Sequence, residues 1–375
     1  MNTTTTPNSS CAERESSSTQ QRVSVIIATL NESENIGRCL ASIKRQNYPD
    51  IEVIVVDGES TDDTRLVAEQ FGARLLLNRQ RVQDVAKMLG LKAATGDVIL
   101  LMDADNALVG NDYISRAVTA LEVHQDAFAI ESTYKQGPQM TSWNVYLTEL
   151  LHISEPVSWL VSCPPSVWNC KGVERCTPTG AWPLGSNGFF FRRKDLVAAG
   201  ILERDRFEDC AVALEVAERL KCERWLRIPG CGVQHYHTVG PHDFIAKRKR
   251  QAFHYLRYRD EVRHRWLAQK PRMSVLWACL CCVSVAAPVA TALLKAIRTG
   301  RKEWLWHPLA CLCNVLGLVL GVVAYARVLH EQALCGIPGP TDVFEASLQP
   351  HWLPDPASAP TTAQFTVASA LHNHG

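Results

Sequence analysis

The chain has 375 residues, a formal net charge of +1 and 21% charged residues. This length can hold one domain of about 250 residues together with further segments. Because the charges balance, no global excess of basic side chains indicates a nucleic-acid partner, and we expect none. The protein contains 14 cysteines. Among them Cys163, Cys170 and Cys176 lie close together, which leaves a zinc or disulfide cluster as the alternative to free thiols in a reducing compartment.

Composition separates a central folded region from two tails. Half of the first twenty residues are Ser or Thr and no apolar run occurs there, so we expect residues 1–21 to be a disordered tail. The stretch 331–375 is rich in Pro and Ala and is expected to be a second, loosely ordered tail. Between the tails we expect an α/β domain at 22–260 and two membrane helices within 273–328.

Short apolar runs alternate with amphipathic stretches between residues 23 and 131. The runs predict five strands, at Val23–Thr29, Ile51–Asp57, Ala73–Leu77, Val98–Met102 and Ala127–Glu131. Helical spacing lies between them, at Glu34–Gln46, Asp62–Phe71, Val82–Ala94 and Asp112–His124. Because the runs are apolar on both faces, they predict a mainly parallel sheet with helices on both sides.

The alternation of apolar runs and amphipathic stretches stops at residues 134–183, which contain four tryptophans and several prolines. We expect an irregular insertion there, with one amphipathic helix near Asn144–Ile153. Regular structure is expected to return as two strands and two helices, at Gly188–Arg192, Trp225–Ile228, Asp209–Leu220 and Asp243–Arg259.

Two apolar segments follow the α/β region. Met273–Leu294 has 22 residues without a charge, and Leu309–Ala326 has 18. A membrane-crossing helix needs about 20 residues, so the first segment qualifies and the second is marginal. The basic residues that precede them favour a cytoplasmic α/β domain. A hairpin that dips into one leaflet and a pair of buried core helices are the alternatives.

Polar side chains follow three predicted strands at the points where the strands end. In an open α/β sheet, ligands bind beyond the carboxyl ends of parallel strands, so these groups are expected to share one rim. The residues concerned are Thr29, Asn31 and Glu32 after the first strand, Asp57 after the second, and Asp103, Ala104 and Asp105 after the fourth.

Asp103 and Asp105 are separated by one small residue. In an extended stretch, side chains at i and i+2 point the same way, so both carboxylates can serve one Mg²⁺ or Mn²⁺ ion. Such an ion would neutralise charge on a departing diphosphate. For the pair taken alone, an exposed turn is the competing interpretation.

Three stretches carry a family resemblance. Ala28-Thr-Leu-Asn-Glu32, Asp57-Gly-Glu-Ser-Thr-Asp-Asp-Thr64 and Leu101-Met-Asp-Ala-Asp105 resemble the signatures of family 2 glycosyltransferases, which have the GT-A fold. The resemblance implies that Thr29, Glu32 and Asp57 hold the base and ribose of a nucleotide-sugar, and that Asp103 and Asp105 serve the ribose, metal and diphosphate. Asn31 and Ala104 lie within the same motifs. Many relatives carry Asn where this chain has Met88, which leaves Lys87 as the expected phosphate contact.

Two later motifs extend the expected site. Gly185-Ser186-Asn187-Gly188 precedes a predicted strand, and in similar enzymes this stretch borders the donor sugar and the acceptor; an ordinary turn is the alternative. Glu208-Asp209 resembles the family's acidic pair at a helix N-terminus. Asp209, with Glu208 second, is the expected base that takes the proton from the attacking oxygen. The alternative is acidic charge that stabilises the helix dipole.

Histidines and basic residues complete the expected site. His237 is the candidate third metal ligand, with His235 behind it, although surface histidines on a strand are common. Lys247, Arg248 and Arg250 are expected to contact either the diphosphate or anionic lipid headgroups, and a solvated helix face is the alternative.

Together these expectations predict a membrane-bound enzyme that transfers a sugar. We expect a nonprocessive, inverting glycosyltransferase that moves a sugar from a UDP- or GDP-sugar to a polyprenyl phosphate or a polyprenyl-diphosphate glycan. The Q-x-x-R-W signature of processive synthases is missing from the sequence. A membrane-docked protein that binds nucleotide-sugar without turnover is the alternative.

Overall fold

The computed structural model describes residues 20–152, 155–180, 182, 184–185, 188–257 and 272–335. The expectations for the two tails therefore lie almost entirely outside the described residues. Ser186 and Asn187 also lie outside them.

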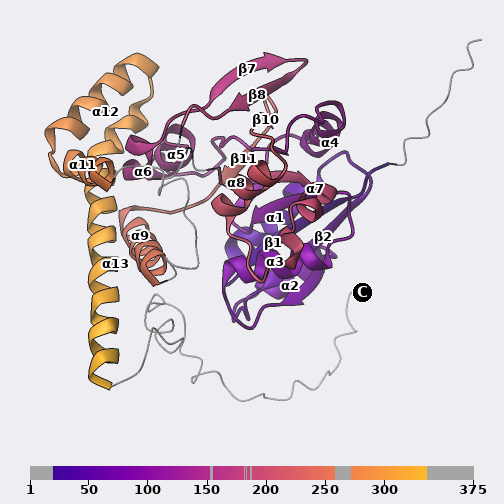
Figure 1. The fold of residues 1–375 in the computed structure, drawn as a ribbon, viewed down its shortest axis with the longest axis horizontal. Coiled ribbons are helices and arrows are strands. Elements are labelled where there is room, and N and C mark those ends of the chain that lie inside the picture. The colour runs from indigo at the N-terminus through magenta and orange to yellow at the C-terminus, as the bar shows by residue number, and fades with distance from the viewer. Residues whose placement is uncertain are drawn as a thin grey trace, which may run out of the picture.

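A nine-stranded sheet forms the centre of the α/β domain, in the order β3-β2-β1-β4-β9-β6-β10-β8-β7 (Figure 1). Only β9 and β8 run antiparallel to both of their neighbours. The prediction of a mainly parallel α/β sheet is therefore confirmed. The strands are β1 Val23–Thr29, β2 Ile51–Asp57, β3 Arg74–Leu77, β4 Val98–Asp103, β6 Ala129–Ile130, β7 Ser166–Cys170, β8 Val173–Thr177, β9 Phe189–Arg192 and β10 Trp225–Arg227.

Helices cover both faces of this sheet because alternate strand residues point to opposite sides. Val25 belongs to a buried cluster with helices α1 and α4, whereas its neighbour Ile26 belongs to a second buried cluster with α3 and α8. The helices of this region are α1 Ser33–Lys44, α2 Thr64–Gln70, α3 Gln83–Ala93, α4 Tyr113–Val123, α7 Arg193–Ala198 and α8 Asp209–Arg219.

The segment 134–183 is more regular than the sequence led us to expect. It contains α5 Ser142–Val145, a π-helical turn at Tyr146–Leu150 and α6 Pro156–Val161. Its hairpin of β7 and β8 joins the sheet by pairing with β10. Lys171 and Gly172 both have positive φ, as the tight turn of such a hairpin requires. The described residues of the expected irregular insertion thus form regular elements, and Cys170 and Cys176 are free thiols.

The first apolar segment, which was expected to be long enough to span a membrane, is broken into two helices, whereas the second forms one long helix. The first segment forms α11 Arg272–Val283 and α12 Ala286–Thr299, which meet at a bend of 79°. Pro288 in the first turn of α12 explains the break, because its ring prevents one continuous helix. The second segment extends to α13 His307–Cys335, and the helical stretch Lys302–Glu331 is long and apolar enough to cross a membrane. Helix α9 Pro241–Arg257 lies alongside α13 (Figure 1).

Candidate active site

The strand register brings the predicted polar groups to one rim of the sheet. Thr29 pairs with Asp57 across β1 and β2, and Ala28 pairs with Asp103 across β1 and β4. The three strands therefore end at the same level, and their carboxyl ends converge as expected. Two short strands outside the sequence prediction, β5 Asn106–Leu108 and β11 Val233–His235, pair beside this rim.

The loops after β1 and β2 hold each other in place. The Asp57 carboxylate is buried and accepts a hydrogen bond from the Ser60 amide at 2.9 Å. Asn31 has a positive φ of 54°, and its backbone N–H donates a hydrogen bond to the Ser60 hydroxyl at 2.8 Å. The Thr29 hydroxyl is buried and has no hydrogen-bond partner within the described part of the chain. These contacts fix the rim and leave the Thr29 hydroxyl available to a ligand.

Glu32 lies at the edge of the same rim, beside the aspartates. Its carboxylate accepts a hydrogen bond from the Asn35 side chain at 2.8 Å. Burial and the nearby Asp105 carboxylate raise the pKa of Glu32 to about 7. The negative charge gathered here therefore favours a proton or another cation.

Lys87 joins two aspartates that are more than a hundred positions apart in the chain. Its buried ammonium lies 3.0 Å from an oxygen of Asp103 and 2.7 Å from one of Asp209. Burial opposes the charge of Lys87, but the two carboxylates more than compensate and raise its pKa. Asp209 begins α8, directly after Glu208. The expected base thus lies beside Asp103, and Lys87, expected at a phosphate, is bound here by carboxylates.

Asp84 is a member of this cluster that sequence reasoning missed. Its backbone oxygen accepts a hydrogen bond from the Phe207 amide at 2.9 Å, which ties the first turn of α3 to the segment before Asp209. Burial and the charge of Asp209 raise the pKa of Asp84 to about 7. In the sequence, an Asp in the first turn of a helix is typical of a simple dipole interaction, so nothing marked it.

A second cluster consists of Asp105, His235 and His237. One ligand atom from each lies within 4.8 Å of the others. The pairing of β5 with β11 sets His235 opposite Asn106, next to Asp105. The His235 Nε2 atom lies 3.3 Å from the Asp105 carboxylate and 3.3 Å from His237 Nδ1.

This cluster differs from the predicted metal ligands in one member. Asp103 is absent from it, because the chain turns at Ala104 and the two aspartates do not continue one extended strand. The Asp103 carboxylate instead accepts a hydrogen bond from the Gln83 amide at 2.7 Å. The candidate group therefore contains Asp105, His237 and His235, while the role expected for Asp103 at the same ion stays a prediction.

The second cluster has the donor set that a divalent cation requires. Oδ1 of Asp105 and Nε2 of His237 are buried and have no hydrogen-bond partner among the described residues. Burial, with nearby positive charge, holds the pKa of His237 well below its usual value, so the imidazole is neutral. Burial alone would raise the pKa of Asp105, but His235 lowers it, which keeps the carboxylate charged. Imidazole and carboxylate groups can together ligate a divalent first-row metal ion such as Mn²⁺.

The basic residues of α9 divide between two surroundings. The Lys247 ammonium lies 2.7 Å from Nδ1 of His237, and burial lowers its pKa to about 8. Arg248 is also buried, but its guanidinium lies 4.0 Å from Glu155 and over the ring of Phe244. Arg250 is exposed. Lys247 is the one of these three described residues that contacts the cluster, and the expected role of Arg248 and Arg250 at a diphosphate or lipid headgroup stays a prediction.

The glycines before β9 have separate surroundings. Gly188 has a φ of +70°, and a Cβ there would come within 2.4 Å of the Ser132 hydroxyl. Gly185 has no atom within 4 Å of such a Cβ. Gly188 is therefore required by packing and backbone conformation, whereas a larger side chain would meet open space at Gly185.

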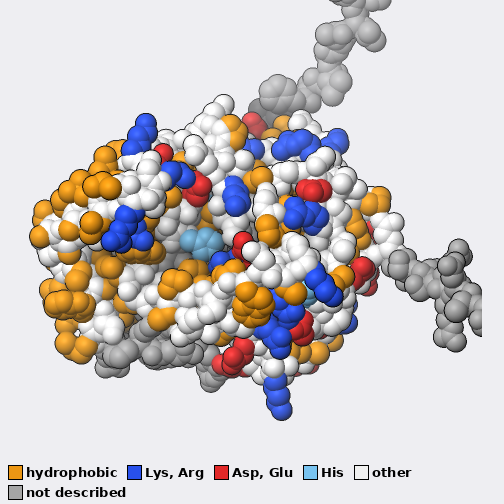
Figure 2. All heavy atoms as spheres, turned by 90° about the horizontal axis from the view of Figure 1, so that it is seen from above, with side chains coloured by type: hydrophobic (Ala, Val, Ile, Leu, Met, Phe, Trp, Pro, Cys, Tyr) orange, Lys and Arg blue, Asp and Glu red, His pale blue; other side chains and the backbone are white. Residues whose placement is uncertain are grey.

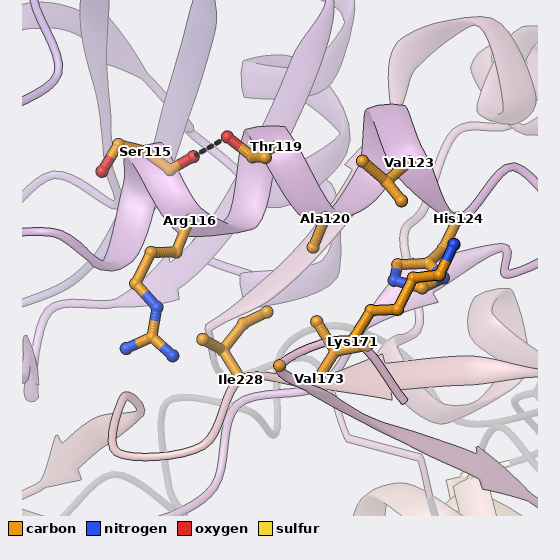
Figure 3. Close-up of a pocket in the computed structure, with 10 residues that line it drawn as sticks. Ser115, Arg116, Thr119, Ala120, Val123, His124, Lys171, Val173 and Ile228 are labelled. Carbon is orange, nitrogen blue, oxygen red and sulfur yellow. Dashed lines mark hydrogen bonds between the residues drawn. The ribbon is translucent and has the colours of Figure 1, made fainter. Parts of the chain in front are cut away.

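A separate cavity of about 380 Å³ lies between α4 and the β7–β8 hairpin (Figure 3). Arg116, His124 and Lys171 contribute its basic groups. The Arg116 guanidinium donates to the Pro229 carbonyl at 2.9 Å, which leaves it engaged with the protein. None of the residues predicted to bind donor or metal lines this cavity.

Residues 24–175 match the model of "Glycosyl transferase family 2". This part of the chain belongs to glycosyl transferase family 2. The match covers Thr29 to Asp105 of the rim, whereas Asp209 and the histidine pair lie beyond it. The family 2 domain has the GT-A-like arrangement of a mostly parallel sheet between helices.

Curated relatives match the N-terminal part of the family 2 domain. A "PGL/p-HBAD biosynthesis glycosyltransferase" of Mycobacterium tuberculosis is 38% identical over 108 residues, which are 27% of this chain and 42% of that protein. "Glycosyltransferase AglE" of Haloferax volcanii is 36% identical over 131 residues, 32% of this chain and 43% of that protein. The chain thus spans about two fifths of the length of these relatives.

Solved structures are similar over a larger share of the chain. The mannosyltransferase PcManGT from Pyrobaculum calidifontis, in complex with GDP-Man and Mn²⁺, is 20% identical with a TM-score of 0.47, over 80% of this chain and 88% of that one. Glucosyl-3-phosphoglycerate synthase from Mycobacterium tuberculosis, in complex with Mn²⁺, UDP and its product, is 18% identical with a TM-score of 0.39, over 63% and 79%.

Proposed function

We propose that the protein is an inverting, nonprocessive glycosyltransferase that uses a UDP- or GDP-sugar. The observation that carries the proposal is the contact of Lys87 with both Asp103 and Asp209, beside the cluster of Asp105 and two histidines. This contact joins the nucleotide motif of the family 2 domain to the helix that bears the expected base. A protein that only holds a nucleotide has no need of a base at that position.

In the proposed reaction the acceptor oxygen attacks the anomeric carbon of the donor sugar. The new C–O bond forms as the bond to the nucleoside diphosphate breaks, and Asp209 takes the proton of a hydroxyl acceptor. A divalent ion held by Asp105, His237 and His235 would neutralise the charge on the departing diphosphate. Thr29, Asp57 and Glu32 would hold the nucleoside, and Gly185 would border the donor sugar.

The proposed acceptor is lipid-linked, either a polyprenyl phosphate or a glycan on a polyprenyl diphosphate. The apolar helices support this choice, because an enzyme held at a bilayer encounters a bilayer-bound substrate more often. We further propose that the family 2 domain lies on the cytoplasmic side, where nucleotide-sugars are available. Labelling of Cys170 by an impermeant thiol reagent in intact cells would contradict this placement.

The activity is tested with the full chain in detergent, a panel of UDP- and GDP-sugars, and a lipid extract. We expect release of nucleoside diphosphate that requires Mn²⁺ or Mg²⁺ and falls by about a hundredfold or more in Asp105→Asn. Asp50→Asn is the control, since this side chain is exposed and pairs with Arg22 at 3.5 Å. Metal-dependent nucleotide binding without release would instead support the alternative of a binding protein.

A further inference from the structure

Three helices in the C-terminal region expose apolar side chains on one side. Along α13 the exposed positions recur every three or four residues, so they form one stripe: Leu309, Leu312, Leu316, Val319 and Val323. On α11, Trp277 is 68% exposed, and on α12, Ile297 is 80% exposed. Figure 2 shows hydrophobic side chains gathered on one side of the molecule, with basic residues among them.

The opposite face of α13 is covered by α9 along the middle of its length. A Cβ at Gly317 would come within 2.5 Å of the Arg248 Cβ, and one at Gly321 within 2.5 Å of the Lys249 carbonyl oxygen. Phe253 and Tyr325 continue the contact, with ring centroids 5.9 Å apart. A glycine pair with this spacing is a common contact between membrane-spanning helices. Here the pair is covered by a basic helix of the same chain.

Hydrogen bonds and an ion pair reinforce the packing of α13 against α6 and α9. The Asn314 side chain donates to the Glu155 carboxylate at 2.8 Å and accepts from the Val157 amide at 3.1 Å. The same carboxylate lies 4.0 Å from Arg248 of α9. The inner face of α13 is therefore fixed to α6 and α9 by a buried polar network.

The connection between α12 and α13 is fixed to the α/β domain as well. Arg301 pairs with Glu149 at 3.0 Å, and the Trp306 indole donates to the Ser142 hydroxyl at 2.9 Å. Both contacted residues belong to the segment before α6. The bent pair of α11 and α12 consequently cannot end on the far side of a membrane from the domain.

A membrane crossing by α13 conflicts with this arrangement. Gly321 lies near the centre of α13, so α9 would enter the hydrocarbon with Lys247, Arg248, Lys249 and Arg250. Ionisable residues at that depth are costly. A helix with an apolar stripe on one side and polar contacts on the other suits the interface of a bilayer.

We infer that α11, α12 and α13 form a monotopic platform that embeds in a single leaflet, with α13 in the plane of the membrane. Its partner is a lipid surface with anionic headgroups, since the exposed basic residues Arg298 and Lys302 follow the exposed Ile297 at the end of α12. The inference rests on the proposed membrane association and does not depend on sugar transfer. It predicts that both ends of the chain lie on the same side of the membrane.

Topology reporters test this arrangement directly. Green fluorescent protein and alkaline phosphatase are each fused before Met1 and after Gly375 of the full chain, in bacterial cells. We expect fluorescence and no phosphatase activity from both ends. Active phosphatase at the C-terminus, with fluorescence at the N-terminus, would show that α13 crosses and would overturn the inference.

Flotation with vesicles tests the partner. The purified full chain is expected to float with vesicles of phosphatidylcholine and phosphatidylglycerol, and Leu316→Glu together with Val319→Glu should lower the bound fraction about tenfold or more. Leu66→Glu is the control, on an exposed position of α2. Unchanged flotation of the double variant would overturn the inference. So would a dimer in detergent that the double variant converts to a monomer, since a second copy would then cover the stripe. Nucleoside diphosphate release by the double variant in detergent reports separately on the proposed activity.

Discussion

Lys87 is the residue on which the charge of the proposed site depends. Its ammonium is buried and lies within 3.0 Å of both Asp103 and Asp209. Without this cation, two carboxylates from distant segments would face each other in a poorly solvated space, and their repulsion would drive them apart. Lys87 thus sets the position of the expected base, Asp209, beside Asp103.

We therefore expect Lys87→Met to lower kcat by about tenfold or more, because Asp209 would lose the ion pair that positions it. Lys92→Met serves as the control. Lys92 lies on the same helix, is 42% exposed, and pairs at 3.9 Å with the fully exposed Asp205. The measurement is nucleoside diphosphate release at saturating donor. Equal rates for the two variants would contradict the role given to Lys87.

At Glu131, the charged neighbours have a larger effect on the pKa than burial does. Burial alone would raise its pKa, but Arg227 and then His152 outweigh burial and hold the pKa at about 2. The Trp225 indole also donates to this carboxylate at 2.8 Å. Because the folded pKa lies below the usual 4.5, the native state binds fewer protons than the unfolded state. The resulting stability is present above pH 4.5 and is lost as the pH falls towards 2.

Replacing the Glu131 carboxylate by a neutral amide removes this contribution to the free energy of unfolding. We expect Glu131→Gln to lower the free energy of unfolding at pH 7 by roughly 3 kcal/mol, because Arg227 keeps a buried charge without its partner. The loss relative to wild type should shrink as the pH is lowered from 4.5 towards 2. Chemical unfolding in detergent across this range is the measurement, and Glu122→Gln on the exposed side of α4 is the control. A pH-independent difference would refute the linkage.

At the scale of elements, short contacts between distant segments complete the site. The three residues of β5 pair with the three of β11, and this places His235 beside Asp105 although 130 positions separate them. The glycines of α13 let α9 approach its backbone closely. Since Lys247 lies on α9, the position of this cation at His237 depends on the packing of an apolar helix.

A larger side chain at this contact should disturb both helices. We expect Gly321→Val to lower the free energy of unfolding by about 1–3 kcal/mol, because its Cβ would lie 2.6 Å from that of Ala252. Leu320→Val is the control, since the neighbouring side chain belongs to the exposed side of the helix. Thermal unfolding in detergent measures both. A variant as stable as wild type would show that α9 does not pack there in solution.

The sequence predicted elements whose patterns are long and self-contained. β1 and β2 were expected with their observed bounds, because continuous apolar runs of seven residues admit few alternatives. The rim followed from the parallel order of those strands. In contrast, β5, β11 and the contact of Lys87 with Asp209 depend on tertiary packing that no local pattern records. The hairpin of β7 and β8 was missed because its turn is Lys-Gly, where Asn-Gly would have been a stronger indication.

At the scale of the whole molecule, the apolar platform and the proposed active site belong to one rigid arrangement. α9 carries Lys247 to the histidine cluster and packs with its other side on α13. The segment before α6 contacts both the strand of His235, through a hydrogen bond of 2.8 Å from Asn144, and the platform, through Trp306. The active site is therefore held at a fixed height above the lipid surface that we infer.

Because the active site is held at a fixed height above the lipid surface, the transfer rate should depend on the concentration of the acceptor in that surface. We keep the total amounts of acceptor and enzyme constant and add neutral detergent to mixed micelles that contain a polyprenyl phosphate. The detergent lowers the mole fraction of the polyprenyl phosphate in the micelle surface, and we expect the transfer rate to fall in proportion to that mole fraction. Tethering confines the encounter to that surface, so the mole fraction there replaces the bulk concentration. Hydrolysis of the donor by water is the internal control and should not change. A transfer rate that followed the bulk concentration at every detergent level would mean that the acceptor reaches the site from solution, and that the platform serves only to anchor the protein.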